Sequence, residues 1–299
     1  MPLRRRWQKG SGRRSNGSGP VAQVRLIQST ALPALFRSPA RSRPGSVNNF
    51  DSYLICTTPR SGSTLLYQLL AATGCAGKPD SYFHAPILEE WMAYYDLDRS
   101  AFPDTKSTLR AIFAEAIHQR KAATDIFGLR LQGKSRAFFL QQLRSLYPTA
   151  GDDLARLKAT FGEVCFVYLN RRNKLEQAIS IVKAEQTGLW HRNADGTELE
   201  RLTPPADPVY DPIAIARYMA ELEEGDAAWR DWFAAQQITP HIIHYEQLEN
   251  DPIGALTDVL YLLGIDPARG AEFTPATDKL ADSTNREWAR RFLADHPTH

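Results

Sequence analysis

A turn rich in small and hydroxyl-bearing residues connects two apolar segments near residue 60. The stretch 52–74 reads SYLICTTPRSGSTLLYQLLAATG. Arg60 supplies a guanidinium whose planar fork fits a phosphate or sulfate, and Gly62 lets the backbone approach a ligand closely. Three hydroxyl donors accompany them: Ser61, Ser63 and Thr64. At the start of a helix, free N–H groups and the positive end of the helix dipole favour an anion. The turn therefore predicts an anion site.

Two simpler interpretations of this turn compete with an anion site. The hydroxyls of 61–64 are residue types that also cap helix N-termini, although an arginine, a glycine and three hydroxyls within five residues exceed what capping requires. An ordinary nucleotide-binding loop would end in Gly-Lys-Ser or Gly-Lys-Thr. The turn has no such lysine. An enzyme that uses ATP or GTP is therefore the weaker hypothesis.

The string TTPRSGSTLL, 57–66, resembles the 5′-phosphosulfate loop of sulfotransferases that use 3′-phosphoadenylyl sulfate (PAPS). The longer string PRSGSTLLYQLLAATGCAGKPDSYF resembles the Stf0 branch of these enzymes. Further similar strings, IIHYEQLENDP and KLADSTNREWARRF, extend the resemblance over about 52–292. The resemblance implies transfer of a sulfuryl group from PAPS to a hydroxyl of a carbohydrate or glycolipid, with release of PAP. An inactive protein that binds PAP or another nucleotide is the alternative from a different class.

A second basic and hydroxyl pair is expected for the 3′-phosphate of PAPS. In YLNRRNKLEQAIS, Arg172 and Ser180 match the family pattern of an arginine at a strand end and a serine on the next helix. Arg171 is the rival, since the spacing in the Stf0 branch can be one residue longer. The other interpretation is a solvated arginine pair. Lys279 is a further candidate contact with the nucleotide, on the resemblance alone.

The base that takes the acceptor proton is not evident. The Stf0 branch has a glutamate two residues after the proline of G-x-P, but Ser81 stands at that position. A serine hydroxyl does not act as a base unaided, so trehalose, the acceptor in the best-known Stf0 member, is in doubt. His84 and Asp80 are the substitutes, since an imidazole titrates near neutrality and a buried aspartate has a raised pKa.

Arg130 is predicted at the end of a strand, facing the same edge of the sheet. It matches a basic position of the family and is a candidate contact for sulfate or acceptor, although a carboxylate partner is an equal possibility. Trp190, Tyr82 and Phe83 are aromatic residues of a kind that stacks on sugar rings. Aromatic residues of this kind more often belong to the core.

Alternating strand and helix patterns must position these residues. Short apolar runs typical of buried parallel strands lie at 53–58, 125–132, 163–169 and 241–248. Helical patterns lie at 64–74, 86–96, 104–121, 135–147 and 174–186, from 212 past 229, and at 252–264. The polar, proline-bearing stretch 191–212 is predicted to be a loop. The pattern predicts an α/β fold with a mostly parallel sheet and helices on both faces, in one domain over 48–299. The resemblance implies that this is a P-loop-like sulfotransferase domain.

Composition sets broad limits on the class of protein. Of 36 basic and 34 acidic residues, ten basic ones and no acidic one lie in 1–50, so the remainder is acidic and gives no reason to expect nucleic acid. Residues 1–47 are predicted to be a disordered basic extension, namely a solvated tail, a polybasic arm or a transit peptide. No run reaches the roughly 20 apolar residues of a membrane span. Widely spaced cysteines, with Cys56 and Cys165 in strand-like runs, favour reduced thiols, a cytoplasmic location and no metal. Relatives suggest a homodimer.

Overall fold

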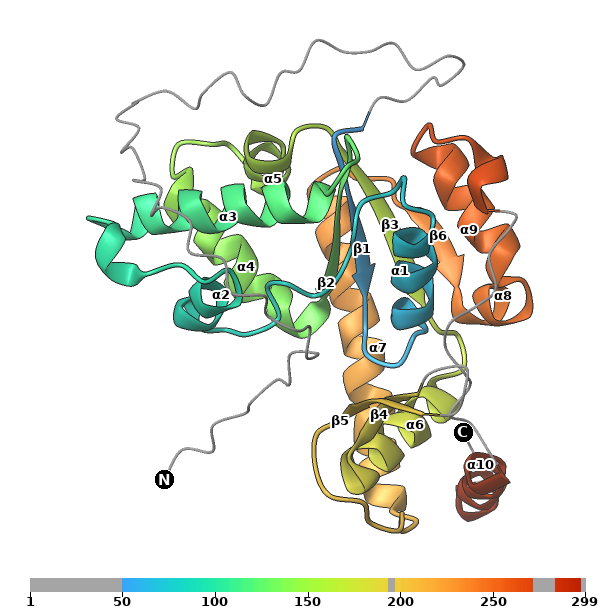
Figure 1. The fold of residues 1–299 in the computed structure, drawn as a ribbon. Coiled ribbons are helices and arrows are strands. Elements are labelled where there is room, and N and C mark those ends of the chain that lie inside the picture. The colour runs from blue at the N-terminus through green and yellow to red at the C-terminus, as the bar shows by residue number, and fades with distance from the viewer. Residues whose placement is uncertain (1–49, 193–196, 271–282, 297–299) are drawn as a thin grey trace, which may run out of the picture. The chain divides into compact units, whose positions relative to one another are not determined.

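Four parallel strands form the central sheet. In the computed structural model, which describes residues 50–192, 197–270 and 283–296, they run in the order β2-β1-β3-β6 (Figure 1). Their bounds are β1 Ser52–Thr57, β2 Phe127–Gln132, β3 Val164–Asn170 and β6 His241–His244. Each pairs in parallel with its neighbours. The carboxyl ends of all four strands therefore meet at one edge, where the anion turn lies.

The strands are apolar throughout because both faces of the sheet are covered. Side chains of a strand point alternately to the two faces. In β1, Leu54 and Cys56 enter one hydrophobic cluster, whereas Tyr53 and Ile55 enter the other. All six residues of β1 are buried, which is why the run lacks the polar alternation of a half-exposed strand. The predicted α/β fold with helices on both faces is confirmed.

Helices cover each face of the sheet (Figure 1). One face carries α2 Leu88–Tyr94, α3 Thr105–Lys121, α4 Gly133–Leu146 and α5 Asp153–Phe161. The other carries α1 Ser63–Ala72, α8 Tyr245–Asn250 and α9 Pro252–Leu262. A third cluster joins α6 Lys174–Thr187, α7 Pro212–Ala235 and α10 Ser283–Asp295. The described residues also form two 3₁₀ turns, η2 Arg99–Ala101 and η3 Pro267–Gly270.

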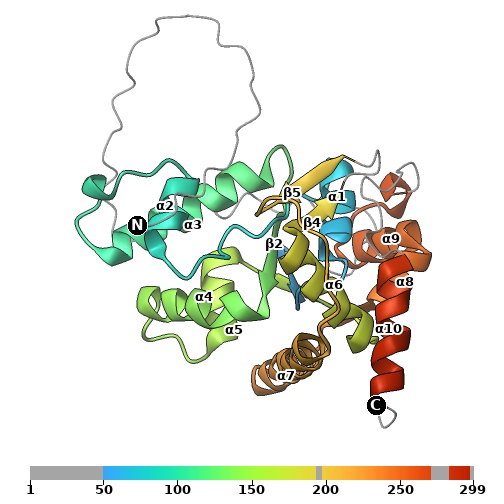
Figure 2. The same ribbon diagram turned by 90° about the horizontal axis from the view of Figure 1, so that it is seen from below.

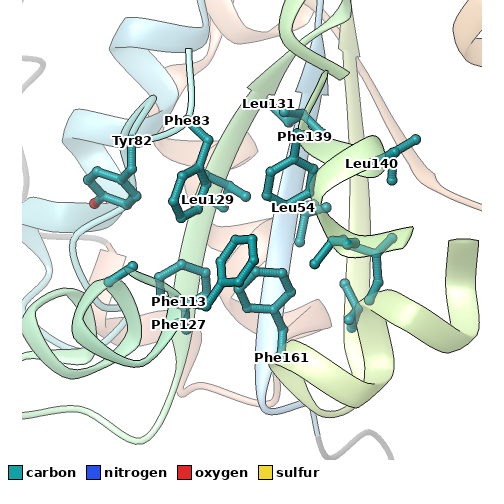
Figure 3. Packing of buried hydrophobic residues seen from close by; sticks show 14 of the residues in the cluster. Leu54, Tyr82, Phe83, Phe113, Phe127, Leu129, Leu131, Phe139, Leu140 and Phe161 are labelled. Atoms are coloured by element: carbon teal, nitrogen blue, oxygen red, sulfur yellow. The ribbon is translucent and has the colours of Figure 1, made fainter. Parts of the chain in front are cut away.

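Aromatic side chains dominate the first cluster, shown in Figure 3. The rings of Phe127 and Phe161 stack with centroids 5.3 Å apart, and Phe83 packs on Phe139 at the same separation. Tyr82 and Phe83 are almost wholly buried. The core interpretation of these two aromatic residues is therefore correct, and neither is open to a sugar ring.

The stretch 191–212 departs from the predicted loop. It contributes to an antiparallel hairpin formed by β4 Leu189–Arg192 and β5 Glu198–Arg201. The strands read LWHR and ELER, and at four residues each they are too short for hydrophobic periodicity to give a signal. Pairing of their backbones, and the side-chain contacts with α1 described below, hold them in place. Figure 2 shows this hairpin beside α1.

One further prediction of an element is corrected, and two helices were missed. The strand predicted over 241–248 ends at His244, because α8 begins at Tyr245. There the side chain of Gln247 accepts from the backbone N–H of His244, as in a capping box. The helices α5 and α10 were not predicted. The basic extension 1–47 and Lys279 lie outside the described residues.

Candidate active site

The turn after β1 presents an uncapped helix start. The N-cap of α1 is Gly62, with φ 83°, and no side chain caps the helix. Five other helices begin with a carboxylate or amide that accepts from a first-turn N–H, namely Asp104, Asp152, Asn173, Asp211 and Asp251. Capping is therefore not what the hydroxyls at 61–64 do. The first-turn N–H groups of α1 are positioned for an outside anion.

The hydroxyls of the turn fix its shape. Ser61 contacts the hydroxyl of Thr57, which donates to the carbonyl oxygen of Leu169 at 2.8 Å. Ser63 and Thr64 accept from another side chain, described below. Arg60 has φ 60°, a left-handed conformation that costs a non-glycine residue free energy. The backbone is thus held in an unusual path, as functional turns often are.

Residues of α6 and α7 support the turn from beneath. Gln177 Nε2 donates to the carbonyl oxygen of Pro59 at 2.6 Å, and Trp229 Nε1 donates to that of Thr57 at 3.1 Å. Both side chains are wholly buried. Hydrogen bonds from buried donors to backbone oxygens restrict the turn to one conformation, which preorganises it for a ligand.

Arg60 lies within the site as an unneutralised cation. Its Nε donates to Ser180 Oγ at 2.9 Å, and its Nη1 donates to the carbonyl oxygen of Trp190. Both acceptors are neutral oxygens. Burial, and then the charge of Arg171, lower the pKa of Arg60 to about 10, which leaves it charged at neutral pH. A charged guanidinium in this setting gains stability when an anion binds.

The two arginines at the end of β3 have different environments. Arg171 is 5% exposed, pairs with Glu176 at 2.7 Å and stacks over the ring of Tyr245 at 4.2 Å. Its buried Nε has no hydrogen-bond partner. Arg172 is exposed, and its backbone N–H donates to Glu246. Of the two predicted candidates, Arg171 is therefore the one that lies beside Arg60 and carries an unused donor.

Arg130 joins β2 to the start of α1. Its Nη1 donates to Thr64 Oγ1 at 3.0 Å and to Ser63 Oγ at 3.4 Å, while its Nε donates to Ser81 Oγ at 2.7 Å. A carboxylate oxygen of Asp80 lies 3.7 Å from its Nη2. The prediction that Arg130 faces this edge of the sheet is confirmed, and it also pairs with a carboxylate.

The two predicted substitutes for the missing glutamate are positioned differently. Asp80 accepts from the backbone N–H of Ser81 at 2.7 Å, in addition to its contact with Arg130. His84 is exposed, and its Nδ1 lies 2.9 Å from the carbonyl oxygen of Ser81. Both lie close to Ser81, the position of the glutamate in the Stf0 branch.

Two titratable groups beside the turn were not predicted from the sequence, His191 and Glu200 on the β4–β5 hairpin. His191 Nε2 lies 3.2 Å from Thr64 Oγ1 and 3.4 Å from Glu200 Oε2. Burial, and then the charges of Arg60 and Arg130, lower the pKa of His191 to about 3. Its imidazole is therefore neutral at physiological pH, and its contact with Glu200 is not an ion pair. An Asp-Gly pair at 195–196 is the one sequence signal of a hairpin here.

A string elsewhere in the sequence fits the spacing of a Walker A loop. Residues 128–135 read GLRLQGKS. In the structure, Gly128 lies inside β2 and Gly133 begins α4, so no loop separates them. The side chain of Lys134 is 75% exposed and pairs with Glu221 at 3.7 Å. The string is a strand–helix junction without an anion cradle, and it lends no support to an ATP- or GTP-using enzyme.

Two kinds of feature are absent from the described residues. No helix among them is long and apolar enough to cross a membrane. Over the same residues, no group of three or more His, Cys, Asp or Glu side chains is arranged to hold a metal ion.

A family model links this site to a known class of transferases. The model described as Stf0 sulphotransferase matches residues 52–295, from the first residue of β1 to the end of α10. The protein is therefore a sulfotransferase. It belongs to the Stf0 family.

Two curated relatives agree with this assignment. A trehalose 2-sulfotransferase of Mycobacterium tuberculosis is 31% identical over 263 residues, covering 82% of this chain and 95% of the relative. A trehalose 2-sulfotransferase of Mycolicibacterium smegmatis is 26% identical over 264 residues, with the same coverage of both chains.

Solved structures with a similar arrangement are more distant. A sulfotransferase from Alicyclobacillus acidocaldarius gives a TM-score of 0.40 at 14% identity, covering 83% of this chain and 93% of its own. The sulfotransferase domain of the olefin synthase from Synechococcus PCC 7002 gives 0.37 at 16% identity, covering 84% and 97%. The family assignment rests on the family model and the two trehalose 2-sulfotransferases.

Proposed function

We propose that the protein transfers a sulfuryl group from PAPS to a hydroxyl of a carbohydrate or glycolipid and releases PAP. One observation carries the proposal: the uncapped start of α1 lies next to Arg60, a charged guanidinium whose hydrogen-bond acceptors are neutral. The free N–H groups and this cation suit the 5′-phosphosulfate of PAPS.

The 3′-phosphate of PAPS needs a second set of donors. We assign it to Arg171 and Ser180, with Arg172 as the rival arginine. Arg171 has a buried Nε without a partner, and Ser180 is hydrogen-bonded to Arg60, so a single network serves both ends of the nucleotide. Lys279 stays a candidate contact on the resemblance alone.

Sulfuryl transfer resembles phosphoryl transfer in what it asks of a protein. The acceptor oxygen must lie in line with the bond that breaks, and the charge that develops on the leaving phosphate must be stabilised. Arg60 and the N–H groups of Ser61 to Thr64 are placed to stabilise that charge. Arg130, linked to Thr64, is our candidate contact for the transferred sulfate or the acceptor.

Both curated relatives are named trehalose 2-sulfotransferases, which supports a sugar hydroxyl as the acceptor here. The identity of that sugar is open, because Ser81 occupies the position of the Stf0 glutamate. His84 and Asp80 lie beside Ser81 and are candidate bases. The free cysteines, two of them buried, fit the proposed cytoplasmic location, and a homodimer is proposed from the relatives alone.

A binding assay and a transfer assay test the proposal separately. Calorimetry should show tight binding of PAP and much weaker binding of ADP, which lacks the 3′-phosphate. Radiolabelled PAPS should then label at least one sugar in a panel of glycans that includes trehalose. Preference for ADP would favour an atypical nucleotide enzyme. PAP binding with no transfer to any acceptor would favour an inactive nucleotide-binding protein.

A further inference from the structure

The β4–β5 hairpin lies against the start of α1. The carbonyl oxygen of Trp190 accepts from Arg60, and His191 contacts the hydroxyl of Thr64 at 3.2 Å. At the base of the hairpin, Arg201 donates to the carbonyl oxygen of Thr187. These contacts bring the side chains of β4 and β5 to the turn that is proposed to hold the sulfonated end of PAPS.

Within the hairpin, His191 and Glu200 lie directly opposite each other in the strand register. Their side chains are 25% and 27% exposed, so each is largely shielded but still reaches solvent. His191 is neutral at physiological pH, as described above. The neutral ring lies with its Nε2 3.4 Å from Glu200 Oε2, so it restricts where the carboxylate can lie without neutralising it.

The groups that face Glu200 come from several elements. Burial raises the pKa of Glu200, and Arg130 and Arg60 offset this in part. The charged and titratable groups around it are Arg60, Tyr67, Asp80, His84, Arg130 and His191. A carboxylate with a raised pKa is a stronger base than an ordinary one. Binding of the anionic donor next to it raises its pKa further.

The other candidate bases are engaged elsewhere. Arg130 and the backbone N–H of Ser81 both contact the same carboxylate oxygen of Asp80, at 3.7 Å and 2.7 Å. His84 is exposed, and its Nδ1 is already on the carbonyl oxygen of Ser81. The Ser81 hydroxyl accepts from Arg130. Glu200, in contrast, is a partly shielded carboxylate. The imidazole of His191 lies next to it and contacts Thr64 at the start of α1.

We propose that Glu200 is the catalytic base of the transfer and that His191 positions its carboxylate. This inference rests on the proposed function. The O–H bond of the acceptor breaks, and its proton passes to a carboxylate oxygen of Glu200. The acceptor oxygen bonds to sulfur as the bond between sulfur and the bridging phosphate oxygen breaks. The electron pair of that bond leaves on the 5′-phosphate of PAP. A glutamate from the hairpin thus supplies the carboxylate that Ser81 lacks.

The test compares Glu200→Gln with Glu198→Gln, an exposed glutamate on the same strand. Glu200→Gln keeps the shape of the side chain and removes the base. It should lower kcat by about 10²–10⁴-fold, the usual contribution of a base. PAP affinity measured by calorimetry should not decrease, because the variant removes a negative charge beside the bound anion. Glu198→Gln should transfer at close to the wild-type rate. If no sugar in the panel is labelled, the same comparison uses the rate of slow PAPS hydrolysis, in which water is the acceptor.

The pH profile adds a readout that a structural role would not move. The wild-type kcat should fall at acid pH as Glu200 is protonated, and this acid limb should disappear in Glu200→Gln. His191→Gln should lower kcat more than it changes KM, because a mispositioned base leaves donor binding intact. The control His118→Gln, at an exposed position of α3, should keep both the rate and the acid limb.

Four outcomes would overturn the assignment. Transfer by Glu200→Gln at the wild-type rate would refute Glu200 as the base. So would loss of activity in His84→Gln while Glu200→Gln is active. Both outcomes leave the proposed function in place. Failure of the wild type to bind PAP removes the proposed function and this inference together. PAP binding with neither transfer nor hydrolysis removes the base and the enzymatic part of the proposal.

Discussion

Arg60 Nε donates a hydrogen bond to Ser180 Oγ across 2.9 Å, although the two residues are 120 positions apart in the chain. Arg60 belongs to the turn after β1, and Ser180 belongs to α6, behind β3. The bond joins the candidate site for the 5′-phosphosulfate to the candidate site for the 3′-phosphate. Loss of either side chain should therefore be felt at both ends of the nucleotide.

Arg60→Ala should abolish PAP binding or lower it greatly. The change removes the charged donor beside the uncapped start of α1, and hydrogen bonds to a charged group are each worth about 1.5–3 kcal/mol. Calorimetry with PAP measures the effect, and Arg110→Ala, an exposed arginine on α3, is the control. Unchanged affinity in Arg60→Ala would remove the turn from the binding site.

Arg171→Ala should weaken PAP by about ten- to a hundredfold, the equivalent of one charge-assisted contact, and should weaken AMP far less. AMP is the comparison ligand because it lacks the 3′-phosphate. Arg172→Ala is the matched control, since it removes the exposed neighbour. If Arg172→Ala shows the selective loss instead, Arg172 is the arginine that binds the 3′-phosphate, as the sequence pattern predicts. Equal losses for PAP and AMP in both variants would refute the assignment of this site to the 3′-phosphate.

Gly62→Ala should reduce both stability and PAP affinity, whereas Gly74→Ala should reduce stability only slightly. Both glycines have positive φ, 83° and 65°, so both alanines carry backbone strain. A Cβ at position 62 would also lie 2.7 Å from the ring of Tyr245, and one at position 74 would meet nothing within 4 Å. Urea unfolding and calorimetry measure the two effects. Equal PAP affinity in the two variants would show that the ring of Tyr245 does not constrain the turn.

The stability of the wild type should decrease as the pH falls from 6.5, the ordinary pKa of histidine, towards about 3, the pKa of His191 in the fold. Between these values the unfolded chain binds a proton at His191 that the folded protein does not bind, so acid favours unfolding. His191→Gln lacks this contribution and should lose less stability over that range. Urea unfolding midpoints at several pH values provide the measurement. The control is His118→Gln, at an exposed position of α3.

The turn and the sheet were predictable because their signals are local. The apolar run of β1 followed by Arg60, Gly62 and the hydroxyls indicates an anion site without any knowledge of tertiary contacts. The same holds for β3 and α6. The exposed or buried state of Arg171 and Arg172 was not predictable, because it depends on the ring of Tyr245, which follows β6.

The hairpin was beyond a single-sequence interpretation for a different reason. Its strands have only four residues each, and their backbone pairing, with contacts to Arg60 and Thr64, determines their place. The sequence alone therefore does not distinguish Glu200 from the other acidic residues of the chain. The string at 128–135 is the opposite case. Its residues match the Walker A pattern, but they form the end of β2 and the start of α4, with no loop between them.

The packing of Gly62 on Tyr245 has a consequence for how the protein is made. A Cβ at Gly62 would clash with that ring, so the first strand–helix turn of the sheet is backed by an element that follows the last strand. During synthesis on the ribosome, the turn emerges long before its support. A nascent chain stopped before residue 245 should leave the anion turn without its aromatic wall, so affinity for PAP should arise only late in translation.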